Sequence, residues 1–260
     1  MPSIPIYQID AFASEVFGGN PAAICPLDAW LDDDRMQAIA AENNLSETAF
    51  FVVDGDGFNL RWFTPTVEVD LCGHATLAAG WLVMERLAPD RDVVRFATRS
   101  GDLFVRRDGN LMVLDLPAAP GERCASPPAL VRGLRAEPAE TLRANYHLAV
   151  FDDEESVAAL DPDMAALVDL YPSAVIASAP GHEVDFVSRF FAPGHGIPED
   201  PVTGSAHCTL APYWSRRLGQ KSLEARQISP RRGELHCEDL GTRVAIGGCA
   251  VLFMEGRVFL

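Results

Sequence analysis

The alternation of hydrophobic and polar positions over the first 65 residues predicts several short strands and one helix. Apolar side chains recur at about every second position from Ile4 to Phe12, which is typical of a half-buried strand. Gly18-Gly-Asn-Pro21 is a turn signal, and a strand resumes after it over 22–25. Asp32 can cap a helix that extends to about residue 43. Further strands are predicted over 49–53 and 58–63.

The next segment is apolar on nearly every side. Residues 74–84 read His-Ala-Thr-Leu-Ala-Ala-Gly-Trp-Leu-Val-Met, which predicts a buried central helix from Gly73 to about Leu87. A second such helix should start at Gly204, and Pro212 should bend or end it early. The remaining patterns predict helices over 127–134 and 162–170 and strands over 93–97, 102–107, 111–116, 141–151, 173–178, 184–190, 223–228, 233–238, 243–248 and 256–259.

The two glycine-led helices belong to a segment that occurs twice. The first copy begins Arg61-Trp-Phe-Thr-Pro and the second Arg189-Phe-Phe-Ala-Pro. A loop, the glycine, an apolar run and a tryptophan follow in both. The repeat predicts an α+β fold of two similar domains, 1–117 and 118–260, each a buried helix wrapped by mostly antiparallel sheet. We expect the two helix starts to face one cleft, and the last strand could pack on the first domain.

Composition and charge narrow the classes of function. The formal charge of −16 repels nucleic-acid backbones, and no basic cluster offsets it. No apolar run has the length of a membrane span, and the start does not resemble a signal peptide. Six scattered cysteines without a Cys-x-x-Cys are expected to be free thiols, and no zinc site is expected. We therefore expect a cytoplasmic protein without nucleic-acid or membrane partners; a homodimer is considered for its assembly.

Three side chains are candidates for proton chemistry. Glu47 precedes the wholly apolar stretch Ala49–Val53, where desolvation would suit it to general acid–base work; the alternative is an exposed loop glutamate. His74 opens the first repeat helix and Asp200 precedes the second, although a packing histidine and a turn aspartate are equally consistent with the sequence.

The helix starts themselves are candidates for substrate binding. Free N–H groups after Gly73 and Gly204, with the hydroxyl of Ser205, would hold a carboxylate. His207 and Cys208 are expected to be core residues. Cys72 could act as a thiolate, but the matching position in the second copy is Thr203.

The ordered set of motifs resembles the PhzF family of phenazine-biosynthesis-type isomerases. The matching stretches are Asp10-Ala-Phe with Phe17-Gly-Gly-Asn20-Pro, Leu45-Ser-Glu47-Thr-Ala-Phe, Phe63-Thr-Pro with Cys72-Gly-His-Ala-Thr, and Asp200-Pro-Val-Thr-Gly-Ser-Ala-His. They follow the family's order from residue 5 to about 215.

The resemblance implies the diaminopimelate-epimerase fold and an isomerase that moves a proton between carbons of a small carboxylate substrate, without metal or cofactor. Glu47 would carry the proton, with His74 and Asp200 as further catalytic residues. Asn20, Gly73, Gly204 and Ser205 would bind substrate. The alternatives are an amino-acid-type epimerase or racemase, for which Thr203 replaces one of the two expected thiols, and a relative that binds a small molecule without turnover.

Overall fold

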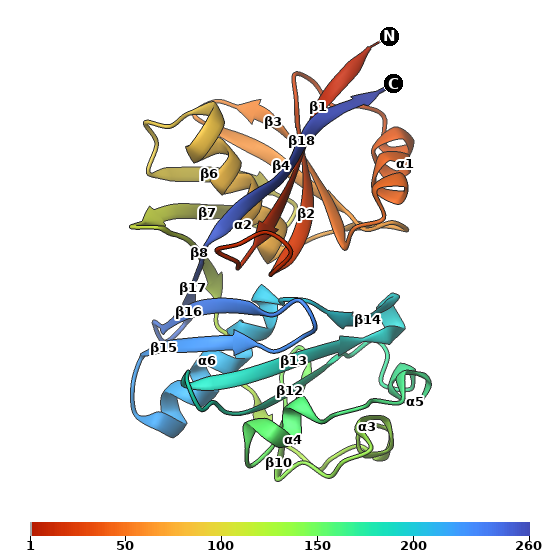
Figure 1. The fold of residues 1–260 in the computed structure, drawn as a ribbon, viewed down its shortest axis with the longest axis vertical. Coiled ribbons are helices and arrows are strands. Elements are labelled where there is room, and N and C mark those ends of the chain that lie inside the picture. The colour runs from red at the N-terminus through yellow and green to blue at the C-terminus, as the bar shows by residue number, and fades with distance from the viewer. Residues whose placement is uncertain (1) are drawn as a thin grey trace. The chain divides into compact units, whose positions relative to one another are not determined.

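The computed structural model describes residues 2–260, which form two compact units (Figure 1). Unit 1 comprises Met1–Asp115 and Gly247–Leu260, and unit 2 comprises Leu116–Ile246. The sequence-based division placed 118–260 in the second domain and left open where the last strand packs. In the structure the residues from Gly247 onward belong to unit 1.

The elements of unit 1 surround one long helical segment. They are β1 (Ser3–Ala11), β2 (Asn20–Leu27), α1 (Asp33–Asn43), β3 (Glu47–Asp54), β4 (Gly57–Phe63), β5 (Glu68–Val69), α2 (Gly73–Leu82), the π-helical turn η1 (Val83–Leu87), β6 (Val93–Thr98), β7 (Gly101–Asp108), β8 (Leu111–Pro117) and β18 (Ala250–Phe259).

Unit 2 repeats the plan with more helices on its outside. Its elements are β9 (Glu122–Arg123), α3 (Pro128–Leu134), β10 (Glu140–Arg143), β11 (His147–Val150), α4 (Glu154–Ala158), α5 (Met164–Val168), β12 (Val175–Pro180), β13 (Phe186–Ala192), the short helix η2 (Pro193–His195), β14 (Ile197–Asp200), α6 (Gly204–Leu218), β15 (Ser222–Gln227), β16 (Gly233–Asp239) and β17 (Arg243–Gly248).

The strands of the two units pair in the same order. In unit 1 the pairs β1–β2, β3–β4 and β6–β7 are antiparallel, whereas β2–β3 and β4–β6 are parallel. In unit 2 the pairs β10–β11, β12–β13 and β15–β16 are antiparallel, whereas β11–β12 and β13–β15 are parallel. The short strands β5 and β14 each pair with the strand that carries the repeated arginine and lead to α2 and α6. The repeat in the sequence is therefore a repeat of topology.

Each repeat helix is the centre of its unit. In α2 every residue but Trp81 is buried, and the helix contacts β1, β2, β3 and β7. Gly80 allows the closest approach, because a Cβ atom there would lie 2.6 Å from Val105 on β7. In α6 the residues from Ala206 to Pro212 are buried, including His207 and Cys208, which were expected in the core.

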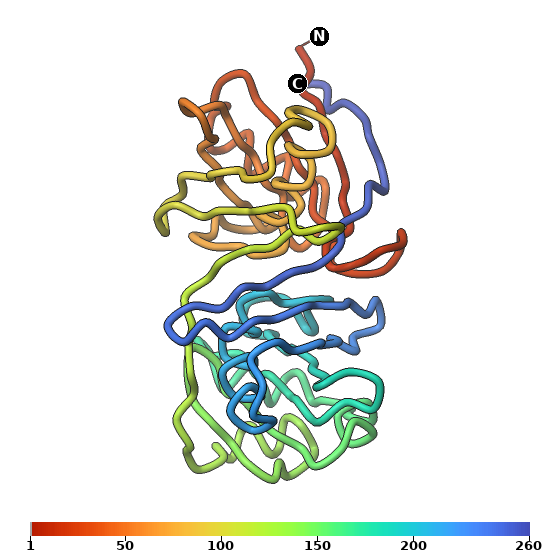
Figure 2. Tube along the Cα trace, turned by 90° about the vertical axis from the view of Figure 1, so that its left-hand side faces the viewer, coloured from red at the N-terminus to blue at the C-terminus, as the bar shows by residue number. Residues whose placement is uncertain are grey.

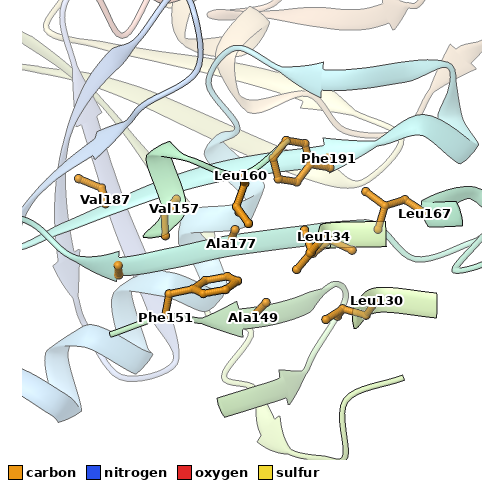
Figure 3. Packing of buried hydrophobic residues seen from close by; sticks show 12 residues of the cluster. Leu130, Leu134, Ala149, Phe151, Val157, Leu160, Leu167, Ala177, Val187 and Phe191 are labelled. Carbon is orange, nitrogen blue, oxygen red and sulfur yellow. The ribbon is translucent and has the colours of Figure 1, made fainter. Parts of the chain in front are cut away.

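A second layer of apolar packing lies under the outer helices of unit 2 (Figure 3). Leu130 and Leu134 of α3, Val157 of α4 and Leu167 of α5 pack against the face of β11, β12 and β13. Phe191 on β13 is fully buried in this cluster. This layer fixes the strand from which the second copy of the repeat starts.

The C-terminal strand completes the sheet of unit 1. β18 pairs with β1 in antiparallel register from Ser3 opposite Phe259 to Ala11 opposite Ala250, with one bulge at Gln8/Ile9. Both views show the red start and the blue end of the chain side by side (Figure 2). β1 is therefore an inner strand, between β2 and β18.

One prediction of secondary structure was wrong, and one of the two alternatives for Pro212 is excluded. The single strand expected over 141–151 is a hairpin, β10 and β11, joined through Ala144 and Tyr146. Pro212 does not end its helix, which continues to Leu218. The carbonyl of Cys208, which loses its usual partner four residues on, accepts a hydrogen bond from Ala119 N at 2.9 Å instead.

The structure can be compared with the expectations of free cysteines and of no membrane-spanning helix. All six cysteines are free thiols. In the described part of the chain, the helices lack the combination of length and apolar character that a transmembrane segment requires.

Candidate active site

Glu47 is the first residue of β3, where the chain leaves an exposed turn and enters the core. In the parallel pair with β2 it lies opposite Ala22, and the next residues of β3 from Thr48 to Phe51 are buried. Its side chain is 13% exposed. The strand thus places a carboxylate at the edge of an apolar interior, as the sequence predicted.

His74 is the second residue of α2 and lies between three polar side chains of unit 1. Its Nε2 is 3.3 Å from Glu47 Oε2. On the other ring edge, Nδ1 is 3.3 Å from Asn20 Nδ2 and 3.5 Å from Cys72 Sγ. The start of one helix and the starts of two parallel strands therefore bring Asn20, Glu47, Cys72 and His74 together, and we call these four residues the unit 1 site.

The protonation state of His74 follows from its surroundings. Burial lowers its pKa from 6.5 to about 3, so the ring is neutral at pH 7. With the Asn20 amide oriented as here, its nitrogen donates to Nδ1, which assigns the ring proton to Nε2. Nε2 lies 3.3 Å from Glu47 Oε2, but the two atoms do not have the geometry of a hydrogen bond. The imidazole is thus held neutral and in contact with the candidate proton carrier.

The unit 1 site also has the residue types of a metal site. One ligand atom each from Glu47, Cys72 and His74 can be chosen so that all lie within 4.8 Å of one another. However, Cys72 faces Nδ1 of the ring and Glu47 faces Nε2. One ion can bind only one of these two ring nitrogens.

Asp200 ends β14 and begins the turn into α6 in unit 2. The side chain is buried and accepts a hydrogen bond from the hydroxyl of Thr203. Gln227, fully buried at the end of β15, accepts from Thr203 N at 2.8 Å and donates to the Asp200 carbonyl at 2.7 Å. One amide side chain thus fixes both ends of this turn. Thr203 has the place of Cys72 in the repeat, but it is engaged as a partner of Asp200.

Ser205 follows Gly204 in the first turn of α6. Its hydroxyl lies 3.1 Å from the hydroxyl of Tyr146, which is on the hairpin between β10 and β11. The ring of Tyr146 packs edge-on against Phe190 with centroids 5.0 Å apart. Two hydroxyl groups therefore meet at the N-terminal end of α6, next to amide groups that can bind an anion. We call Asp200, Thr203, Ser205, Tyr146 and Gln227 the unit 2 site.

The sequence identified part of each site. Within unit 1 the structure brings together Asn20, Glu47, Gly73 and His74; within unit 2, Asp200, Gly204 and Ser205 lie in one turn. Sequence reasoning missed Tyr146 and Gln227. Both lie in stretches with an ordinary strand pattern, and only the pairing of distant strands brings them to α6. No local signal distinguishes them.

The comparisons with known proteins agree with one another. Residues 9–256 match the family described as phenazine biosynthesis-like protein, PhzC-PhzF. The chain is similar to an uncharacterized isomerase of Pseudomonas aeruginosa, with 54% identity and 99% of each chain covered. It is also similar to the crystal structure of a PhzF-family phenazine biosynthesis protein of Enterococcus faecalis, with a TM-score of 0.97, 46% identity and full coverage of both chains. A hydroxyproline epimerase of Agrobacterium vitis shares the fold, with a TM-score of 0.61 at 10% identity over 98% of this chain and 92% of that one.

Proposed function

Because this chain belongs to the phenazine biosynthesis-like (PhzC-PhzF) family of isomerases, we propose that it moves a proton between two carbons of a small carboxylate-bearing metabolite. Glu47 is the general acid and base in this proposal. The observation that carries it is the contact of 3.3 Å between Glu47 Oε2 and His74 Nε2 at the edge of a buried strand.

The proposed reaction needs one group that can accept a proton and release it again. Glu47 takes the proton from the first carbon, and the electron pair of the broken C–H bond moves through the unsaturated part of the substrate. A new C–H bond then forms at the second carbon with the proton from Glu47. Atoms and electrons balance without an added oxidant or reductant.

His74 suits this role because it is neutral. An imidazolium would hold Glu47 as half of an ion pair and oppose its protonation. A neutral ring in contact with Oε2 limits the positions open to the carboxylate without opposing its protonation. We therefore assign His74 the orientation of Glu47, and Asn20 the orientation of His74.

We propose that the unit 2 site contributes to the same reaction. Ser205, Tyr146 and the first amide groups of α6 would bind the carboxylate of the substrate. Asp200, whose turn is fixed by Gln227, would accept a hydrogen bond from a polar group of the substrate. An epimerase with two thiol bases is the second candidate, favoured by Cys72 beside His74, but Thr203 leaves it without the second thiol.

The proposal is tested in two steps. Carboxylate-bearing metabolites are screened by thermal shift against the wild-type protein, since a ligand that binds the native state raises its melting temperature. Each ligand found is then incubated with wild type and with Glu47→Gln in deuterated water and followed by NMR. We expect the ligand to stabilise both proteins, while turnover falls by about 10²–10⁴-fold in Glu47→Gln.

The exposed Glu42 supplies the matched control, because Glu42→Gln removes a carboxylate from α1 without touching the site. Turnover of Glu47→Gln at the wild-type rate would refute the assignment. A ligand that both proteins bind and neither converts would identify a binding protein instead. Complete solvent labelling of product together with an inactive Cys72→Ala would favour the two-base epimerase.

A further inference from the structure

The arginine of the repeated motif makes the same interaction in both units. Arg61 on β4 grips Glu68 with Nε–Oε1 at 2.7 Å and Nη2–Oε2 at 2.8 Å. Arg189 on β13 grips Glu199 with Nε–Oε1 at 2.7 Å and Nη2–Oε2 at 2.9 Å. Two parallel N–H···O bonds fix both the distance and the plane of the carboxylate. We call these two pairs the carboxylate clamps.

Both clamps are largely shielded from water. The four side chains are between 11% and 18% exposed. Each guanidinium also lies over the aromatic ring two residues later, 5.2 Å from Phe63 and 4.9 Å from Phe191. Charges in such a setting contribute little net stability compared with apolar residues, while the loss of one partner is costly. Their presence at equivalent places in two units indicates a role in geometry.

Each clamp lies at the point where the chain leads into the site of that unit. Glu68 begins β5 and comes five residues before Gly73, and Glu199 lies on β14 five residues before Gly204. The first interval contains Cys72 and is followed directly by His74, and the second contains Asp200 and Thr203. A displacement of either short strand would therefore pass directly into the residues of that unit's site.

We propose that Arg61 and Arg189 are positioning residues, which set the starts of α2 and α6 through their clamps on Glu68 and Glu199. Besides its clamp, Arg61 donates to Asp33, and Arg189 donates to the carbonyls of Val157 and Leu160; none of these belongs to the unit 1 or unit 2 site. In the proposal each arginine acts on its site through the backbone of a short strand. The effect on turnover rests on the proposed function, whereas the effect on the backbone does not.

Hydrogen exchange read by mass spectrometry tests the backbone arm. In Arg61→Met, exchange of the amides over 70–76 should rise by about tenfold or more, with 203–207 unchanged. Arg189→Met should give the reverse. Arg95→Met is the matched control, because Arg95 forms half-exposed ion pairs with Asp54 and Asp102 and should alter neither segment. Unchanged exchange at the matching segment, or an equal rise throughout the unit, would overturn the proposal.

A double variant separates positioning from stability. Arg61→Met leaves Glu68 paired with Arg99 alone, whose Nη2 lies 2.8 Å from Oε2. Adding Glu68→Leu removes the remaining buried charge, so the melting temperature should return toward that of the wild type. Amide exchange over 70–76 should nevertheless remain faster than in the wild type. In both Arg61→Met and the double variant we expect kcat to be about 10- to 100-fold below the wild-type value, with KM within about threefold of it. Recovery of wild-type exchange and kcat in this variant would show that the clamp is only structural. A wild-type protein without turnover would refute the proposed function and leave the exchange result standing.

Discussion

His74 Nε2 and Glu47 Oε2 approach each other across 3.3 Å without the geometry of a hydrogen bond. Asn20 acts on the opposite ring edge, where its amide nitrogen donates to Nδ1 and so leaves the ring proton on Nε2. The side chain that sets the tautomer is thus separate from the one proposed to carry the proton. The roles of Asn20 and Glu47 can therefore be tested by separate substitutions.

Asn20→Asp should reverse the tautomer of His74. A carboxylate facing Nδ1 attracts the ring proton to that edge and removes it from Nε2, the nitrogen nearest Glu47. Nitrogen NMR of labelled His74 should show the proton on Nδ1, and kcat should fall by about tenfold or more. Asn20→Ser, which does not force the proton to Nδ1, is the control. Retention of the proton on Nε2 in Asn20→Asp would contradict the hydrogen-bond assignment.

Cys72→Ala should have a modest effect, less than about tenfold on kcat. The thiol lies 3.5 Å from Nδ1, an atom that Asn20 also contacts, so the orientation of His74 survives its loss. Steady-state kinetics on the substrate found by the screen measures the effect. A loss as complete as that of Glu47→Gln would instead make Cys72 a base and support an epimerase.

Buried histidines should make the fold sensitive to mild acid. Burial lowers the pKa from 6.5 to about 3 in His74 and to about 4 in His207. Below pH 6.5 the unfolded chain takes up protons that the native state does not. Stability is therefore complete above pH 6.5 and falls on acidification, by about 1.4 kcal/mol per pH unit for each histidine.

Urea unfolding between pH 7.5 and 5 measures this slope. His207→Gln should reduce the slope by between about a third and a half, because burial also lowers the pKa of the half-buried His147 to about 4; this holds even if the variant is less stable at every pH. The control is His182→Gln, since Glu155 raises the pKa of that exposed histidine and its removal cannot flatten the decline. A free energy of unfolding that does not change from pH 6.5 to 5 would contradict the prediction.

Pro212→Ala should not raise the free energy of unfolding as such a substitution in a helix usually does. Replacing a proline inside a helix ordinarily recovers about 3 kcal/mol. Here the Cys208 carbonyl is already bonded to Ala119 N, and the buried proline ring would be lost. We expect the free energy of unfolding, measured in urea, to change by less than about 1 kcal/mol. Ala119→Pro, which removes the donor, should cost about 1–3 kcal/mol; a full gain in Pro212→Ala would show that the carbonyl bond is unimportant.

The sequence predicted most elements because their patterns are local. The apolar run after Gly73 could only be a central helix, and the repeat by itself indicated two similar units. That the helix does not end at Pro212 could not be predicted, because the donor that compensates for the proline, Ala119 N, is more than ninety positions away from it. The hairpin over 140–150 was missed because the turn at Ala144–Tyr146 has no glycine or proline to mark it.

The residues of the two sites could likewise be predicted from the sequence only where they stand in local motifs. Glu47, His74 and Asp200 stand in motifs, so they could be chosen from spacing and family resemblance. Gln227 and Tyr146 could not, since they reach the start of α6 only through strand pairing. The tautomer of His74 was also beyond the sequence, because it depends on which atom of Asn20 faces the ring.

The pairing of β1 with β18 has a consequence for the order of events during synthesis. Unit 2 has all of its residues once Ile246 has been made, whereas unit 1 lacks a strand until residues 250–259 emerge. Until then β1 is an unprotected edge, with backbone donors and acceptors open to other chains. Unit 2 can therefore finish folding before unit 1. Unit 1 avoids association with other chains only if β18 is translated soon afterwards.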